Sequence, residues 1–253
     1  MPPPTQPTTQ QAHHGRASGD SAIGSVRAHL CLWIVAGLGL WFDLASKSWA
    51  FATLRPDESR TVISGFIAAR RSLNSGALFG AFPGWVGVFI IASVAALAFV
   101  LYVFACSGRR QWFLHLGLAC ILAGALGNLH DRALVQADVI DLLPSAGHET
   151  TQYIGIIVSP ADADPVVVAP FPDEHPHFRR EYPRREITGI ARHGVVRDFV
   201  KFQPIAGFDY WPWVFNVADA LLVVGLIVLM ITFWHEHRRA KAAARQETLA
   251  TAG

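Results

Sequence analysis

The sequence predicts an all-α membrane protein with four transmembrane helices and an extramembrane, periplasmic region that contains short β-strands. Of its 253 residues, 52% are hydrophobic and only 16% are charged, a balance too apolar for an ordinary soluble domain. Four separate stretches are apolar over about 20 residues, the length needed to cross the hydrocarbon core of a bilayer. The net charge is only +2 and the basic residues form no continuous stripe, so nucleic acid is not an expected partner.

The first element is a polar N-terminal tail. Residues 1–29 are rich in Pro, Gln, Thr and Ser and contain little to bury, so we expect a disordered cytoplasmic tail. The first span follows at 30–51. No small-residue cleavage site follows this apolar run, so we interpret it as an uncleaved helix and not as a signal peptide.

Three further spans are expected at 85–106, 112–130 and 213–234, so that the four-span domain covers 30–234. A short link at 107–111 joins the second and third spans as a tight hairpin. Residues 133–193 form an extramembrane insertion of 61 residues, with a β-prone patch at 153–158. Residues 235–253 form a basic cytoplasmic tail.

The distribution of Lys and Arg predicts that both termini are cytoplasmic. Eight of these residues lie in the N-terminal tail, the 107–111 link and the C-terminal tail, whereas the first outer loop holds four. An even number of spans also places both termini on one side. The remaining loops then lie on the outer side of the membrane.

The ionisable residues of the predicted spans gather at their outer ends. Asp43 and Lys47 lie near the end of the first span, Asp131 and Arg132 close the third, and Asp219 lies in the first turns of the fourth. An ionisable side chain within a span costs roughly 3 kcal/mol on insertion scales, so each of these residues is a candidate for function.

Two more polar stretches approach the same surface. Asp198 lies shortly before the fourth span, and the stretch 74–80, which begins Asn74-Ser75-Gly76, lies shortly before the second. Two carboxylates held close together cannot both ionise easily, so they share a proton, and one acts as general base on water while the other acts as general acid. This convergence predicts hydrolysis of an amide bond.

Structural roles remain open for several of these residues. Asp43 and Lys47 are four residues apart and can form an ion pair at the interface. Asp131 can terminate the third span, and Asn216 with Asp219 can cap the start of the fourth.

Two other function classes remain open on the residues alone. One is a small proton- or ion-coupled membrane transporter component, and the other is a non-catalytic membrane interaction protein whose insertion binds a partner. A transporter site usually lies near the bilayer midplane, often within internal repeats, and neither feature is visible in this sequence. The histidine pairs at 175–177 and 235–237 are short motifs in polar segments, so we expect no metal and no cofactor.

Five blocks of this sequence resemble, in order, the signature motifs of the lipoprotein signal peptidase (signal peptidase II, prolipoprotein signal peptidase) family. The first two are Asp43-Leu44-Ala45-Ser46-Lys47 and Asn74-Ser75-Gly76-Ala77-Leu78-Phe79-Gly80. The others are Gly127-Asn128-Leu129-His130-Asp131-Arg132, Gly194-Val195-Val196-Arg197-Asp198-Phe199 and Phe215-Asn216-Val217-Ala218-Asp219.

The resemblance implies an aspartic-type endopeptidase that cleaves prolipoproteins N-terminal to a diacylglyceryl-modified cysteine, using two aspartates, water and no metal. Asp198 and Asp219 match the catalytic positions. The substrate-binding or site-supporting positions are matched by Asp43, Asn74, Gly76, Asn128, Arg132 and Asn216. The resemblance also implies a multi-pass protein of the bacterial cytoplasmic (inner) membrane, with its active site at the outer face. We expect a monomer, surrounded by membrane lipid.

The insertion at 133–193 departs from the family pattern, because the family usually has only a handful of residues between Arg132 and the glycine of the next block. Asp141 follows Arg132 at the usual distance, so it is an alternative first aspartate. We prefer Asp198, because Gly194 precedes it and Phe199 follows it, as in the family's block.

Overall fold

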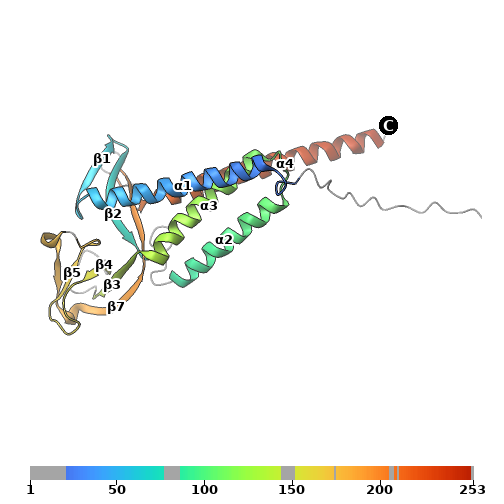
Figure 1. Cartoon of the computed structure of the whole chain (residues 1–253). Helices are drawn as coiled ribbons and strands as arrows, with labels where there is room; N and C mark the ends of the chain where they lie inside the picture. The colour runs from blue at the N-terminus through green and yellow to red at the C-terminus, as the bar shows by residue number, and fades with distance from the viewer. Residues whose placement is uncertain are drawn as a thin grey trace, which may run out of the picture.

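The computed structural model describes residues 21–76, 86–143, 152–173, 175–204, 208–209 and 211–251. Long helices form a bundle, and the β-strands gather at one end of it (Figure 1). The helices are α1 (Val26–Thr53), α2 (Val86–Cys106), α3 (Trp112–Leu134) and α4 (Val217–Thr251). All four are long and apolar enough to cross a membrane, in agreement with the four spans expected from the sequence.

Helix α3 is the centre of the bundle and packs against α1, α2 and α4. Small residues allow this close packing: a Cβ atom on Gly124 would lie 2.4 Å from the carbonyl oxygen of Ala218, and one on Gly225 would lie 2.7 Å from that of Gly117. Lipid supplies no hydrophobic force between helices, so close backbone approach is what holds such a bundle together. Helices α1, α2 and α4 turn large apolar side chains outward, as expected for a surface in contact with lipid.

A four-stranded antiparallel sheet lies at the end of the bundle where α1 ends and α4 begins (Figure 1). Its order is β1 (Ser59–Ile63), β2 (Ile67–Asn74), β8 (Val196–Phe202) and β9 (Val214–Phe215). The register of β2 with β8 sets Ser72 opposite Asp198. Apolar residues from the end of α1, including Phe51 and Leu54, pack with Phe199 of β8 and fix the sheet to the bundle.

The insertion forms a second, five-stranded sheet. Its order is β6 (Arg180–Tyr182), β5 (Val166–Ala169), β4 (Gln152–Ile157), β3 (Gln136–Leu142) and β7 (Ile187–Gly194), and short 3-10 turns lie at Pro176–Phe178 and Arg184–Glu186. Strand β4 overlaps the β-prone patch at 153–158. A small core that contains Ile140, Val166 and Val168 holds the sheet together.

The all-α class predicted from the sequence is therefore too narrow, because two sheets accompany the four helices. Most of these strands are short, and the pairings of β2 with β8 and of β3 with β7 join residues that are distant in sequence. Strand β3, for example, pairs with β7 from Gln136–Gly194 to Leu142–Ile187, and composition does not reveal such long-range pairing.

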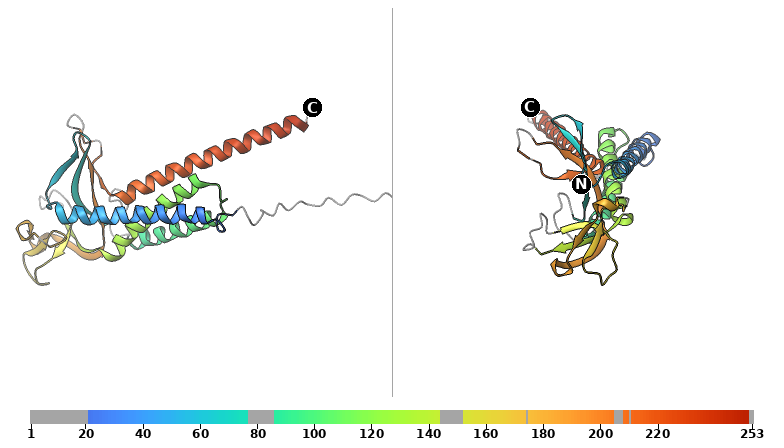
Figure 2. Two further views of the ribbon diagram at one scale, coloured as in Figure 1. Left: turned by 45° about the horizontal axis from the view of Figure 1, so that its top comes forward. Right: turned by 90° about the vertical axis from the view of Figure 1, so that its left-hand side faces the viewer.

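Two helices are longer than the predicted spans. Helix α1 begins at Val26, within the predicted tail, and Ser25 caps it by accepting a hydrogen bond from the backbone N–H of Ala28. Helix α4 continues to Thr251 through the predicted C-terminal tail and projects from the bundle away from the sheets (Figure 2). Residues 1–20 of the N-terminal tail, residues 77–80 of the second family block and Trp85 lie outside the described residues.

Candidate active site

Asp198 lies on β8, at the junction of the first sheet and the bundle. Its side chain is only 2% exposed. Because β2 runs beside β8, Asn74 lies close enough to donate a hydrogen bond from Nδ2 to Asp198 Oδ2, at 3.2 Å. Asn216 donates to the other carboxyl oxygen, Oδ1, at 2.5 Å. Two amides thus hold a carboxyl group that has almost no contact with solvent.

Asp219 lies in the first turn of α4 and is partly exposed. Its carboxyl Oδ2 accepts a hydrogen bond from the backbone N–H of Asn216 at 3.2 Å, and its own backbone N–H donates to Asn216 Oδ1 at 3.0 Å. These reciprocal bonds are the pattern of a capping box. The capping role that the sequence left open is therefore real, and it also orients the Asp219 carboxyl group.

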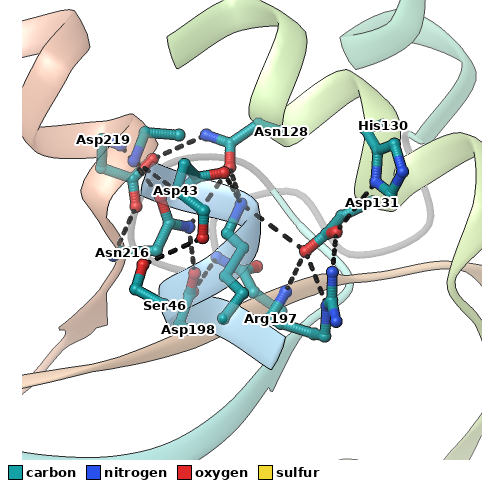
Figure 3. A network of polar contacts seen from close by, with 12 residues as sticks. Asp43, Ser46, Asn128, His130, Asp131, Arg197, Asp198, Asn216 and Asp219 are labelled. Atoms are coloured by element: carbon teal, nitrogen blue, oxygen red, sulfur yellow. Dashed lines mark hydrogen bonds and ion pairs between the residues drawn. The ribbon is translucent and has the colours of Figure 1, made fainter. Parts of the chain in front are cut away.

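Asn216 and Asn128 join the two carboxyl groups into one network (Figure 3). Asn216 Nδ2 reaches both Asp198 Oδ1 and Asn128 Oδ1, the latter at 3.2 Å. Asn128 Nδ2 in turn donates to Asp219 Oδ1 at 2.8 Å. A movement of either asparagine would therefore change the hydrogen bonding of both aspartates.

Burial raises the pKa of Asp198 to about 8, and the negative charge of nearby Asp219 contributes to the rise. Hydrogen bonds from Asn216 and Asn74 oppose this change, because they favour the ionised carboxylate. Asp198 therefore keeps its proton at neutral pH.

A cavity of about 320 Å³ lies beside the two aspartates. Five of the predicted site residues line it, namely Asn74, Asn128, Arg132, Asp198 and Asp219. The rest of its wall is mostly apolar and comes from β8, β9, α4 and Trp211. Such a cavity suits a ligand that is largely apolar and has a few polar groups.

Arg132 is held at the edge of this cavity. Its Nη2 donates a hydrogen bond to the carbonyl oxygen of Gly76 at 3.2 Å, and its guanidinium lies 5.4 Å from the centre of the Phe89 ring. The role of Gly76 is thus to supply a backbone acceptor, while its own N–H donates to Asn74 Oδ1 at 2.9 Å.

Behind the cavity lies a largely buried group of charges (Figure 3). Lys47 Nζ lies 2.8 Å from Asp43 Oδ2 and 3.5 Å from Asp131 Oδ2, and it donates a hydrogen bond to Asn128 Oδ1 at 3.1 Å. Arg197 Nη2 makes a second ion pair with Asp131 Oδ1 at 2.8 Å. This group connects the first and third helices to β8 and fixes the acceptor side of Asn128.

The network also reaches the start of α4. Asp43 Oδ1 accepts a hydrogen bond from the backbone N–H of Ala218 at 2.8 Å, so Asp43 is an ion-pair partner and a positioning group but does not line the cavity. Gly127 makes room for it, because a Cβ atom there would lie 2.4 Å from Asp43 Oδ2. Asn216 likewise contacts both aspartates from behind the cavity wall.

Asp141, the alternative first aspartate, lies elsewhere. It is exposed on β3 of the second sheet, where it accepts a hydrogen bond from Gln152 Nε2 at 2.8 Å, and it does not line the cavity. The structure therefore favours Asp198 over Asp141 as the partner of Asp219.

The set of site residues implied by the family resemblance did not include Lys47, Asp131 or Arg197. Their signal was present, since Lys47 and Asp131 are charges within predicted spans, and Arg197 directly precedes Asp198. A larger cavity of about 570 Å³ lies between the two sheets, but Asp57 is the only carboxylate among the described residues that line it. It therefore offers no carboxylate pair. Among the described residues, no three His, Cys, Asp or Glu side chains are grouped as metal ligands.

Known proteins resemble this chain over most of its length. A family model described as Signal peptidase (SPase) II matches residues 35–169 and 182–235. A lipoprotein signal peptidase of Desulfitobacterium hafniense is 27% identical over 210 residues, which cover 83% of this chain and 97% of that protein. One from Desulforapulum autotrophicum is 34% identical over 211 residues, which cover 81% of this chain and 93% of that protein.

Two solved structures of bacterial membrane enzymes share the fold. The first is 20% identical, with a TM-score of 0.53, and the match covers 81% of this chain and 87% of the other. The second is 22% identical, with a TM-score of 0.50, and the match covers 79% of this chain and 90% of the other.

Proposed function

The chain belongs to the signal peptidase II family, and we propose that Asp198 and Asp219 are the catalytic pair with which it works. It is an aspartic-type endopeptidase and a multi-pass protein of a bacterial membrane. It removes signal peptides from prolipoproteins. The observation that carries the catalytic assignment is the pair of carboxyl groups that share one cavity and one asparagine network.

The two aspartates have different surroundings, and this gives them different roles. Asp198 is buried and protonated at neutral pH, so it is the general acid. Asp219 is partly exposed and accepts hydrogen bonds from Asn128 and from a backbone N–H at the positive end of α4, which suits a general base. The assignment follows the rule that different surroundings give the two members of a catalytic carboxylate pair different roles.

The reaction then proceeds through these two groups. The Asp219 carboxylate takes a proton from a water molecule, whose oxygen attacks the scissile carbonyl carbon, while Asp198 donates its proton to the carbonyl oxygen. As the tetrahedral intermediate collapses, the C–N bond breaks, the leaving amine takes the proton held by Asp219, and Asp198 takes back a proton from the hydroxyl group, so both carboxyl groups return to their starting states. Arg132 faces the same cavity and is placed to stabilise negative charge on the substrate.

We place the cleaved bond immediately N-terminal to a diacylglyceryl-modified cysteine. The mostly apolar cavity wall, which includes Val223 and Val224 of α4, suits acyl chains that stay in the hydrocarbon region while the peptide bond reaches the carboxyl groups. We further propose that the enzyme is a monomer in the inner membrane with both termini in the cytoplasm. The excess of Lys and Arg at the chain ends and in the 107–111 link supports this orientation, with the sheets and the dyad at the outer face.

The pH dependence of cleavage tests these roles. If Asp198 must be protonated, kcat/KM for a diacylglyceryl-modified prolipoprotein should fall as the pH rises through about 8. Asn74→Ala removes a hydrogen bond that favours the ionised form, so this basic limb should move to higher pH. Ser75→Ala is the control, because Ser75 bonds to Gln152 and not to the dyad, and it should leave the limb in place. A basic limb at the same pH in wild type and Asn74→Ala would contradict the assignment.

A further inference from the structure

A second cavity lies at the end of the bundle opposite the dyad, between the start of α3 and the middle of α4. Its volume is about 560 Å³. Apolar side chains from both helices form most of its surface: Trp112, Phe113, Leu114, Val228 and Ile231. Figure 2 shows that this end of the bundle, from which α4 projects, lies far from both sheets. The cavity is thus separate from the catalytic site.

Cationic side chains form the rim of this cavity. Arg110 and Arg239 both line it and both are exposed. Neither makes a hydrogen bond or ion pair with any residue in the part of the chain that the structure describes. A carboxylate on the rim, Glu236, accepts a hydrogen bond from Gln111 Nε2 at 2.6 Å, and it forms no ion pair with either arginine in the part of the chain that the structure describes. The rim therefore presents two available guanidinium groups.

The combination of an apolar lining and a cationic rim identifies the chemistry of the ligand. Guanidinium groups pair strongly with phosphate, because their N–H donors match two phosphate oxygens. A small soluble phosphate would satisfy the rim but would leave the apolar lining in contact with water. A phosphate that carries acyl chains satisfies both parts. Helix α3 also begins at this cavity, and the positive end of its dipole adds to the field of the arginines.

We propose that this cavity binds an anionic phospholipid, with its phosphate between Arg110 and Arg239 and an acyl chain along Trp112 and Val228. Helices α3 and α4 also carry Asn128 and Asp219 at their ends farthest from this cavity, so a lipid that bridges the start of α3 and the middle of α4 would stabilise the helix pair that positions Asp219. The proposal does not depend on the catalytic assignment.

Native mass spectrometry of the full chain in detergent tests the proposal, with dioleoyl phosphatidylglycerol and dioleoyl phosphatidylcholine as probes. At about 1 kcal/mol per basic residue at a membrane surface, two arginines predict a preference of about 30-fold for the anionic lipid. Arg110→Ala/Arg239→Ala should abolish this preference. Arg245→Ala removes one arginine from α4 beyond the cavity, and it should keep the preference.

Five outcomes are informative. A preference lost in the double variant and kept in Arg245→Ala would support the site. Equal binding of the two lipids by wild type, or an unchanged preference in the double variant, would overturn it. An equal loss in Arg245→Ala would reduce the effect to general surface charge. Glycerol phosphate, added as a soluble probe, should bind far more weakly, and binding as tight as that of the lipid would overturn the assignment to a lipid.

Discussion

Lys47 offers a quantitative test of the buried charge network. Its side chain is fully buried and lies between Asp43, at 2.8 Å, and Asp131, at 3.5 Å. Lys47→Met keeps the length of the side chain but removes the charge. Asp131 would still have Arg197, whereas Asp43 would have no cation within ion-pair distance in the described part of the chain.

An unpaired buried carboxylate is expensive. Removal of one partner from a buried ion pair typically costs about 3–5 kcal/mol, so the free energy of unfolding of Lys47→Met should fall by about that amount. Activity should fall as well, because Lys47 also holds Asn128, which bonds to Asp219. The first quantity can be measured by reversible unfolding in mixed micelles and the second by cleavage of a prolipoprotein.

The double variant Lys47→Met/Asp43→Asn separates these two effects. It leaves no unpaired charge at Asp43, so most of the lost stability should return. Asn128 still lacks its lysine partner, so activity should remain low. The reasoning is refuted if Lys47→Met loses less than about 1 kcal/mol, or if the double variant is no more stable than the single one.

Three further substitutions test other parts of the account. Asp198→Asn tests the buried acid. Because the folded-state pKa of Asp198 is raised from 3.8 to about 8, the wild type should lose stability as the pH rises from about 4 to about 8. The stability advantage of Asp198→Asn over wild type in thermal unfolding should therefore grow over that window and then level off. An advantage that does not change with pH would contradict the raised pKa. Gly194→Ala places a Cβ atom 1.7 Å from the carbonyl oxygen of Arg132, so strand and helix must separate, and we expect a loss of about 1–3 kcal/mol in unfolding and a fall in kcat. The control Gly37→Ala meets nothing within 4 Å and should be harmless, and equal damage by both would refute the explanation. Arg132→Lys cannot reproduce both the bond to Gly76 and the contact with Phe89, so kcat/KM should fall about tenfold or more, and unaltered kinetics would remove Arg132 from the site.

The part of the fold that could be predicted from the sequence is the part governed by local composition. Four apolar stretches indicated four helices, and charges inside them marked Asp43, Asp131 and Asp219 as unusual. The helix ends were harder to place. The segment after Trp234 is polar, and it nevertheless continues as a regular helix to Thr251.

The unpredicted part depends on contacts between residues distant in the sequence. The bond from Lys47 to Asn128 spans 81 residues, and that from Asn74 to Asp198 spans 124. No periodicity or composition encodes such pairs. The same limit explains why Asp141 remained an alternative, because only the strand pairing places it on the second sheet and Asp198 on the first.

Asn216 and Asp219 both cap helix α4 and belong to the candidate site. The sequence presented capping and catalysis as alternatives, but the same atoms serve both, since a carboxyl group fixed by a capping box is already oriented toward the cavity. A residue pattern with an adequate structural explanation can therefore still be functional.

The central claim is that Asp198 and Asp219 carry out the cleavage, and the most direct test compares Asp198→Asn, Asp219→Asn and Asp141→Asn with wild type. Each purified protein would receive a diacylglyceryl-modified prolipoprotein in detergent, with and without a chelator. The account predicts that cleavage resists the chelator, is lost in the first two variants and is kept in Asp141→Asn. Cleavage that survives in folded Asp198→Asn but disappears in Asp141→Asn would contradict the claim and move the catalytic pair.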